Sequence, residues 1–169
     1  MNPLLVRPHE PDSHGCLLEI TPQNAGWQHV GFKVHRLEAG ESVSGGESER
    51  EICVVVLSGL ATVKTNDQDF GQLGGRDSVF DDAAPGAVYI PAGGNFSAVA
   101  IGRAEVALCS APGKPGRKSR VIADSAMSRE VRGRGTNTRY VRNILPQTEP
   151  ADSLLVVEVI TPGGNWSSY

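Results

Sequence analysis

The sequence of 169 residues has few aromatic side chains, few cysteines and no long apolar run. Aromatic residues make up 5% of it, and three cysteines, Cys16, Cys53 and Cys109, lack the paired spacing of a disulfide framework. The odd count favours buried thiols in a reducing compartment, so we expect a cytoplasmic protein. No apolar stretch approaches the roughly 20 residues of a membrane-spanning helix, and we expect no signal peptide and no membrane partner.

The sequence also lacks a strong net charge. Its 16 Lys and Arg residues and 19 Asp and Glu residues give a formal net charge of −3. This balance gives no global electrostatic argument for nucleic-acid binding. The charge is unevenly spread, however, because the segment 114–142 holds nine basic residues and two acidic ones, a net charge of +7.

Glycine (20 residues) and proline (11 residues) are plentiful, and the apolar residues fall in short runs. Alternation at 30–34 predicts a half-buried strand, and the β-branched run 52–57 predicts a buried one. Ser58-Gly59 predicts a turn that joins this run to 60–63 as a hairpin. Further strands are expected at 78–80, 87–90, 96–101 and 105–110. Many short strands between glycine and proline turns, without a long amphipathic helix, predict an all-β sandwich, barrel or jelly roll.

A phrase near the start of the chain returns near its end. Positions 20–27 read ITPQNAGW and positions 159–169 read VITPGGNWSSY, and a Leu-Leu pair and a glutamate precede each copy. The offset of about 140 residues exceeds solenoid repeats and matches the size of a domain. We therefore expect the duplication of a whole domain, with only the opening of the second copy in this sequence.

The order of turns and strands resembles the cupin fold, the double-stranded β-helix form of the jelly roll. Cupins typically carry Gly, His-x-His, Glu and Gly, followed by Pro-x-Gly and another His, and these histidines and the glutamate bind a divalent metal. Here Gly46, Ser48 and Phe96 stand at the three histidine positions, and only Glu51 matches. One carboxylate does not make a transition-metal site, so we expect no metal and no cofactor in this barrel.

The remaining candidate ligands do not restore such a site. Glu51 invites a general-base role, but the simpler interpretation is a hydrogen-bonded or solvated carboxylate at the start of a strand. No histidine forms His-x-His or Glu-x-x-His, and we interpret all four as surface or hydrogen-bonded strand residues. They are His9, His14, His29 and His35.

Longer blocks are similar to the 5-deoxyglucuronate isomerase family of inositol catabolism, which is related to the 5-keto-4-deoxyuronate isomerases. The blocks are SVFD at 78–81, AVYIP at 87–91, EVALCSAP at 105–112, RGxGxNxRxVxNILP at 132–146 and LLVVEVITPGGNWSSY at 154–169. The last two are long and specific. The match covers essentially the whole chain, but only the first part of a typical family member.

The resemblance implies an all-β cupin, the N-terminal barrel of a bicupin whose second barrel is missing. The domains expected are a barrel at 1–113, a basic connecting segment at 114–153 and the first strand of a second, truncated cupin at 154–169. The divalent metal is implied in the missing barrel, so we expect no catalytic residue here and an inactive isolated chain. A homo-oligomer is also expected.

The reaction implied is an aldose–ketose isomerisation of a small-molecule sugar acid in carbohydrate metabolism. It converts 5-deoxy-D-glucuronate to 5-dehydro-2-deoxy-D-gluconate, which makes the parent enzyme an isomerase of the intramolecular oxidoreductase class. Two alternatives stay open. One is a metal-free cupin module for binding or assembly, and the other is a uronate ketol-isomerase of pectin breakdown.

The basic stretch supplies the candidates for substrate binding. Arg132, Arg134 and Arg139 could hold a carboxylate, for which the planar guanidinium is suited. The alternative, which we favour, is that the arginines of the stretch pair with the acidic first barrel, with a second barrel or with another subunit. The run RGRG resembles RNA-binding segments, but only Tyr140 could stack on a base there, so no nucleic-acid partner is expected.

Overall fold

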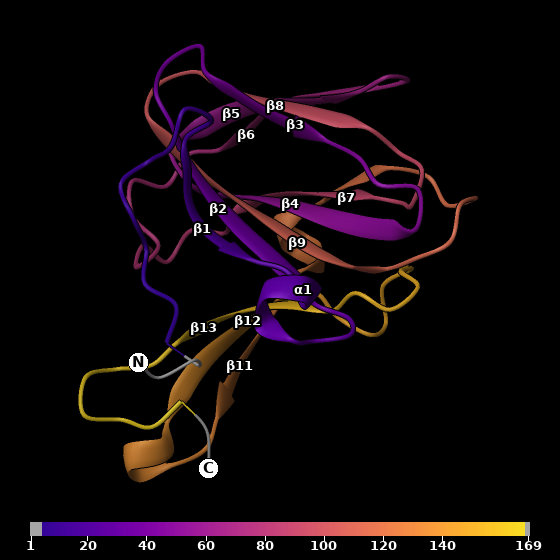
Figure 1. Cartoon of the computed structure of the whole chain (residues 1–169). Helices are drawn as coiled ribbons and strands as arrows, with labels where there is room; N and C mark the ends of the chain where they lie inside the picture. Colours follow the sequence, from indigo (N-terminus) through magenta and orange to yellow (C-terminus); the bar gives the residue numbers. More distant parts are fainter. Residues whose placement is uncertain (1–4, 168–169) are drawn as a thin grey trace.

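Three β-sheets lie in stacked layers in the computed structural model, which describes residues 5–167 (Figure 1). The middle sheet has the order β1 (Cys16–Ile20), β2 (Gly31–Leu37), β9 (Ala104–Pro112), β4 (Arg50–Ser58), β7 (Gly86–Ile90) and β10 (Arg120–Ile122). The upper sheet has the order β3 (Ser42–Gly45), β8 (Phe96–Ala100), β5 (Leu60–Thr65) and β6 (Asp69–Gly74). The lower sheet has the order β11 (Ser128–Arg132), β12 (Arg139–Leu145) and β13 (Val156–Ile160).

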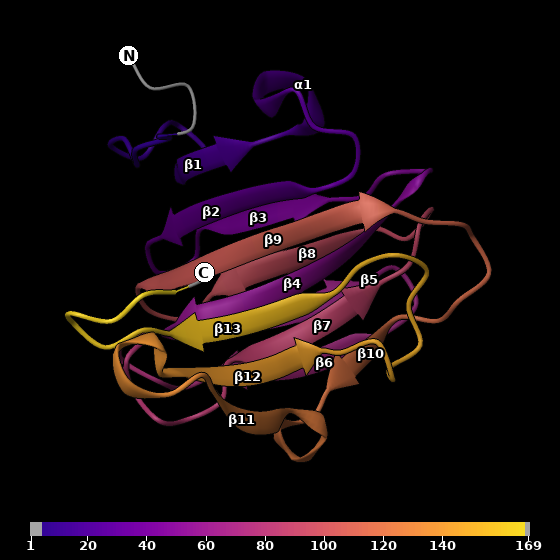
Figure 2. The ribbon, with the colours of Figure 1, turned by 90° about the horizontal axis from the view of Figure 1, so that it is seen from below.

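The β-branched run of β4 is buried on both of its faces, which is why it is continuously apolar rather than alternating. Ile52 and Val54 face the core between the middle and upper sheets. Cys53 and Val55 face a second core, which the lower sheet completes with residues such as Leu145. Seen from below, β12 and β13 lie over β4 and β7 (Figure 2). The middle sheet is therefore the centre of the molecule.

Helical structure is short in the described part of the chain. It consists of α1 (Pro22–Ala25) and two 3₁₀ turns, Asp124–Ala126 and Gly135–Asn137. Thr21 caps α1, because its hydroxyl accepts a hydrogen bond from the backbone N–H of Asn24, and the Asn24 side-chain oxygen accepts one from the backbone N–H of Thr21. Across residues 5–167, no helix is long and apolar enough to cross a bilayer.

The predicted hairpin between 52–57 and 60–63 is wrong, although both strands exist. β4 pairs with β7 and β9, while β5 pairs with β6 and β8 in the other sheet. The turn at Gly59 (φ +75°) carries the chain from one sheet to the other, because Val54 and Val63 must both face the core between them. A Cβ at Gly59 would lie within 2.2 Å of the Arg103 carbonyl oxygen, so only glycine fits this crossing.

The strand predicted at 78–80 is also wrong, since the backbone there bends and turns. The Asp81 carboxylate accepts hydrogen bonds from the backbone N–H groups of Asp77 and Ser78 at 2.9 and 3.0 Å. This local pairing competes with a strand ladder and closes a loop instead. The other predicted strands are confirmed as β2, β4, β5, β7, β8 and β9.

The segment 114–153, expected to connect two barrels, carries three strands of its own. β10 pairs with β7 at the edge of the middle sheet, and β11 and β12 form an antiparallel pair. The apolar run after it supplies β13, which pairs antiparallel with β12. The end of the repeated phrase, Ser168 and Tyr169, lies outside the described residues. The division into two cupins stays a prediction.

The middle and upper sheets face each other as the two halves of a cupin jelly roll. From β2 to β5, and again from β6 to β9, successive strands along the chain lie in opposite sheets, as in this all-β fold. The lower sheet is an addition that covers the outer face of the middle sheet.

Candidate functional site

Glu51 is a fully buried carboxylate with four hydrogen-bond donors around it. The Tyr89 hydroxyl donates to it at 2.6 Å, and the backbone N–H groups of Asp152, Ser153 and Leu154 donate at 2.9, 2.6 and 2.6 Å. Burial and this bond to a carboxylate raise the pKa of Tyr89, which keeps the phenol a donor. We refer to Glu51 with these four partners as the clasp, because it ties the segment 152–154 to β4.

The clasp shows which way the Glu51 side chain points from β4, where it matches the glutamate position of the cupin motif. Alternation along β4 places its side chain on the face of Cys53 and Val55, toward the lower sheet, and not on the face of Ile52 and Val54 inside the barrel. The simpler interpretation, a hydrogen-bonded carboxylate at the start of a strand, is confirmed.

The other residues at the metal-ligand positions do not fit a metal either. A Cβ at Gly46 would lie 2.2 Å from the Asn95 side-chain oxygen and 2.4 Å from the Gly94 carbonyl, which leaves no room for an imidazole. Phe96 is buried in the barrel core. Within residues 5–167, no group of three or more His, Cys, Asp or Glu side chains could hold a metal ion.

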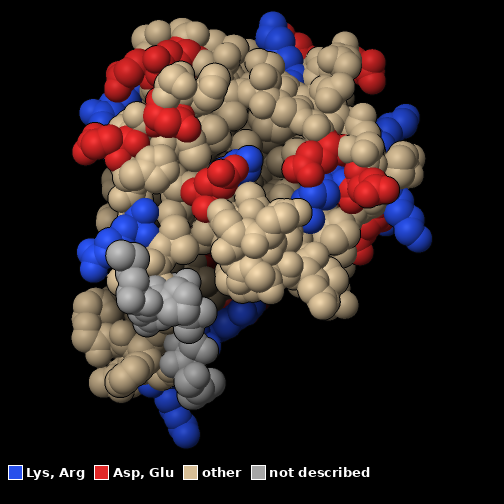
Figure 3. Space-filling model, in the orientation of Figure 1, with Lys and Arg blue, Asp and Glu red and all other residues tan. Residues whose placement is uncertain are grey.

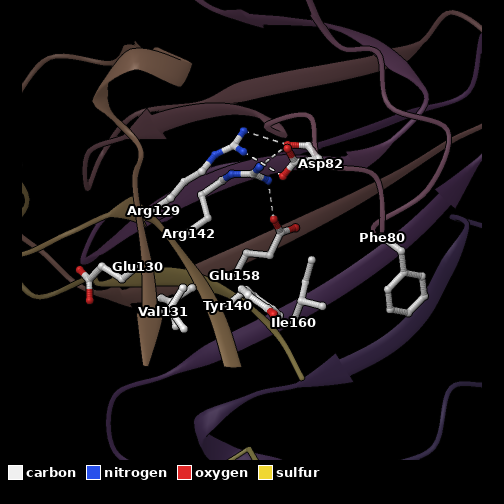
Figure 4. A pocket seen from close by; sticks show the side chains of 10 residues that line it. Phe80, Asp82, Arg129, Glu130, Val131, Tyr140, Arg142, Glu158 and Ile160 are labelled. Atoms are coloured by element: carbon white, nitrogen blue, oxygen red, sulfur yellow. Dashed lines mark hydrogen bonds and ion pairs between the residues drawn. The ribbon is translucent and has the colours of Figure 1, made fainter. Parts of the chain in front are cut away.

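A cleft of about 390 Å³ lies between the lower sheet and the loop after β6. Figure 4 shows its charged end, where Arg129 and Arg142 point toward Asp82, and the aromatic rings of Tyr140 and Phe80 further along. The cleft is lined by Phe80, Asp82, Arg129, Glu130, Val131, Tyr140, Val141, Arg142, Glu158 and Ile160. Away from the charged end, Phe80 and Val131 are 78% and 65% exposed, so this part of the cleft is open and apolar.

The charged end of the cleft is built from one row across the lower sheet. Arg142 stands opposite Arg129 on β11 and opposite Glu158 on β13. Arg142 donates to the Glu158 carboxylate at 2.7 Å and to the Asp82 carbonyl oxygen at 2.6 Å, while Arg129 pairs with the Asp82 carboxylate at 2.8 Å. These arginines therefore join the lower sheet to the barrel, as the structural alternative expected.

Arg76 completes this ion-pair network from the barrel side. Its side chain is fully buried, and it donates to the Leu57 carbonyl oxygen and to the Glu158 carboxylate, each at 2.5 Å. Glu158 thus stands between two buried guanidinium groups, those of Arg76 and Arg142. Because both of its oxygens are engaged, the carboxylate holds two layers together rather than facing a ligand.

The predicted substrate arginines lie elsewhere. Arg132 and Arg139 stand opposite each other at the end of the β11–β12 pair, and Arg134 is exposed in the turn between them. Arg132 bonds Glu130 at 3.0 Å, and Arg139 bonds the Asn137 side chain at 2.6 Å. None of the three lines the cleft. Their contact with a substrate stays a prediction.

Two residues of the network were not predicted from the sequence. Glu158 carried a signal, because a glutamate precedes both copies of the repeated phrase. Arg76 carried none, since it is a lone arginine between Gly75 and Asp77. Over the face shown in Figure 3, acidic and basic side chains are interspersed, and no single-sign patch suggests a polyanion.

Comparison with known proteins gives a consistent set of similarities. Residues 4–169 match the KduI/IolB family. The chain is 43% identical to a 5-deoxy-glucuronate isomerase of Geobacillus kaustophilus (strain HTA426), over 100% of this chain and 61% of that protein. It is 39% identical to a 5-deoxy-glucuronate isomerase of Bacillus subtilis (strain 168), over 100% of this chain and 64% of that protein.

Solved structures agree with these sequence similarities. An IolB-like protein from Salmonella typhimurium LT2 is 44% identical and superposes with a TM-score of 0.86, covering 91% of this chain and 59% of that one. The protein Ylba from E. coli, at 18% identity and a TM-score of 0.57, shares the fold alone. The chain spans about three-fifths of the length of the curated relatives it matches.

Proposed function

The chain belongs to the KduI/IolB family, and from that premise we propose that it is the N-terminal part of a 5-deoxy-glucuronate isomerase. The observation that carries the proposal is the 43% identity, over the whole chain, to a protein of that name. The substrate is then a small sugar acid, 5-deoxy-glucuronate, and the reaction is the aldose–ketose isomerisation implied by the resemblance.

In this proposal the barrel is structural and the catalytic groups lie outside the chain. The three histidine positions of the cupin motif hold a glycine, a serine and a phenylalanine, and Glu51 faces away from the barrel interior. A divalent metal, which would polarise the carbonyl of the sugar, is therefore assigned to residues of the full-length protein beyond this chain. The role of this part is to present the lower sheet, fixed by the clasp and the Arg76–Glu158–Arg142 network, as a rigid surface.

The compartment and the oligomeric state are also part of the proposal. The three cysteines are free thiols, which suits a reducing compartment, and we propose that the enzyme works in the cytoplasm as a homo-oligomer.

A chimera tests the proposed function. This chain would replace the matching 61% of the Geobacillus kaustophilus relative, and isomerisation of 5-deoxy-D-glucuronate would be followed by proton NMR. We expect turnover by the chimera, its loss after chelation of divalent metal, and none by the 169-residue chain alone. The intact relative is the positive control. A chimera that is folded by circular dichroism but does not turn over the sugar would contradict the proposal.

A further inference from the structure

A second cavity opens at the end of the barrel where β4 begins and β9 ends. Its volume is about 290 Å³, near the lower limit of small-molecule sites, and it shares no lining residue with the cleft described above. Buried Ile52 and Phe96 line it together with the more exposed Ser44 and Gln23. A small cavity with both apolar and polar walls is the usual form of a ligand site.

Arg50 is the charged residue fixed in this cavity. Its side chain is 16% exposed. Nη2 donates to the His29 carbonyl oxygen at 2.7 Å and to the Ser110 hydroxyl at 3.0 Å, and Nε donates to the same hydroxyl at 3.3 Å. Among residues 5–167, Nη1 has no hydrogen-bond partner. The guanidinium is thus oriented in advance, with one nitrogen left to donate.

Two glycines make room for this arrangement. A Cβ at Gly31 would lie 2.6 Å from the Ser110 hydroxyl and 3.3 Å from Nη2 of Arg50, so any side chain there would disturb the hydrogen bonds that hold the guanidinium. Gly46 also lines the cavity, at a position where a cupin has a histidine, and Phe96 lines it at another. Two of the positions that hold metal-binding histidines in a cupin therefore line a cavity that contains Arg50.

The charges around the cavity favour a single negative charge. Lys33 lines it and pairs with Glu19 at 2.6 Å. Glu47 also lines it, 3.6 Å from Nε of Arg50, but its side chain is 52% exposed and the ion pair is weak. A monoanion adds one negative charge beside Glu47, whereas a dianion would add two and meet a stronger repulsion.

We propose that this cavity binds a small hydroxylated carboxylate, with the carboxylate on Nη1 of Arg50 and hydroxyl groups toward Thr21, Gln23 and Ser44. A carboxylate matches a fixed guanidinium nitrogen, and hydroxyl groups match the hydroxyl and amide side chains of the cavity. The carboxylate rests on Arg50 alone, while the choice of a sugar acid rests on the proposed function. The site is separate from any metal-dependent catalysis.

Titration of the isolated chain with D-glucuronate tests the proposal. Nitrogen-15 NMR would follow the Arg50 side-chain N–H and the backbone amides of Gly45 and Gly46. We expect saturable shifts with a millimolar Kd, no saturation with D-glucose, and at least tenfold weaker binding of acetate, which lacks hydroxyl groups. Equal binding of D-glucose, or no saturation up to about 50 mM D-glucuronate, would overturn the proposal.

Variants separate this site from a general effect on the fold. Arg50→Gln removes the charge and is expected to weaken D-glucuronate binding at least about tenfold. Ser44→Leu puts an apolar side chain at the cavity wall while it keeps the charge of Arg50, and it should abolish the shifts. The matched control is Arg103→Gln, whose side chain is 63% exposed and does not line the cavity, and it should bind normally. Unchanged binding by either cavity variant would refute the site even if the chimera is an active isomerase.

Discussion

Replacing Glu51 with glutamine tests whether the clasp holds the lower sheet on the barrel. Oε1 of Glu51 accepts the N–H groups of Ser153 and Leu154, and Oε2 accepts the Tyr89 hydroxyl and the Asp152 N–H. Glutamine keeps one acceptor oxygen. In its best orientation the amide oxygen still accepts the N–H groups of Ser153 and Leu154, and the amide NH₂ group faces Tyr89 and Asp152. The Tyr89 hydroxyl can then accept a hydrogen bond instead of donating one, but the Asp152 N–H is left without an acceptor.

The expected loss of stability follows from these bonds. An orphaned buried donor costs about 1–3 kcal/mol, and each of the two retained bonds weakens by about 1 kcal/mol when its acceptor loses its charge. The neutral amide is easier to bury than the carboxylate, which offsets part of this loss. We expect Glu51→Gln to lower the free energy of unfolding by about 3 kcal/mol, or the melting temperature by about 6–12 °C.

Urea unfolding and amide hydrogen exchange provide the measurement. In the variant, the Ser153 and Leu154 amides should lose protection more than those of β5, which lies on the far side of the barrel. Glu38→Gln is the control, because this carboxylate is 65% exposed and 3.7 Å from Arg103, and it should change stability by less than about 0.5 kcal/mol. A Glu51→Gln protein as stable as the native one, with unchanged exchange at 152–154, would refute the reasoning.

Two further predictions concern buried groups. Glu158→Gln leaves the fully buried Arg76 and its neighbour Arg142 without their carboxylate; unfolding in urea should show a loss of about 3–5 kcal/mol, and a loss below about 1 kcal/mol would contradict a structural network. Burial raises the pKa of the Cys109 thiol to about 12 and that of Cys53 well above its usual value. Ellman's reagent at pH 8 should therefore leave the buried Cys53 unmodified in the native protein, react slowly with the partly buried Cys109, and react with both in denaturant; rapid native reaction of Cys53 would show that the second core is open.

The strands of the barrel could be predicted because their apolar residues are continuous or alternate. The run 52–57 has no polar residue, and only a strand buried on both faces needs that. Which sheet each strand joins was not predictable from adjacency. Ser58-Gly59 suits a hairpin, but the same glycine also permits a crossing between sheets, and the need to bury Val54 and Val63 in one core decides between them.

The lower sheet was not predicted because charged residues interrupt the apolar pattern of its strands. Positions 128–142 read as a basic connecting segment, since Arg129 and Arg142 break the apolar pattern of β11 and β12. Their partners, the Asp82 carboxylate and Glu158, are remote in sequence. Motif spacing located Glu51 on β4, and its interpretation as a hydrogen-bonded carboxylate at the start of a strand is confirmed. Only the alternation of buried neighbours along β4 shows which face it occupies.

The clasp joins residues that are more than 100 positions apart, and this has a consequence for synthesis on the ribosome. β9 ends at Pro112, so the two facing sheets, apart from the edge strand β10, can assemble before Leu154 and Val156 are translated. At 5–20 residues per second, the interval is roughly 2–9 seconds. Throughout it, the back of the middle sheet, with Cys53 and Tyr89, faces water uncovered. During this interval the nascent chain exposes an apolar sheet face that other unfinished chains can contact, so release of the chain before the lower sheet is made would favour aggregation.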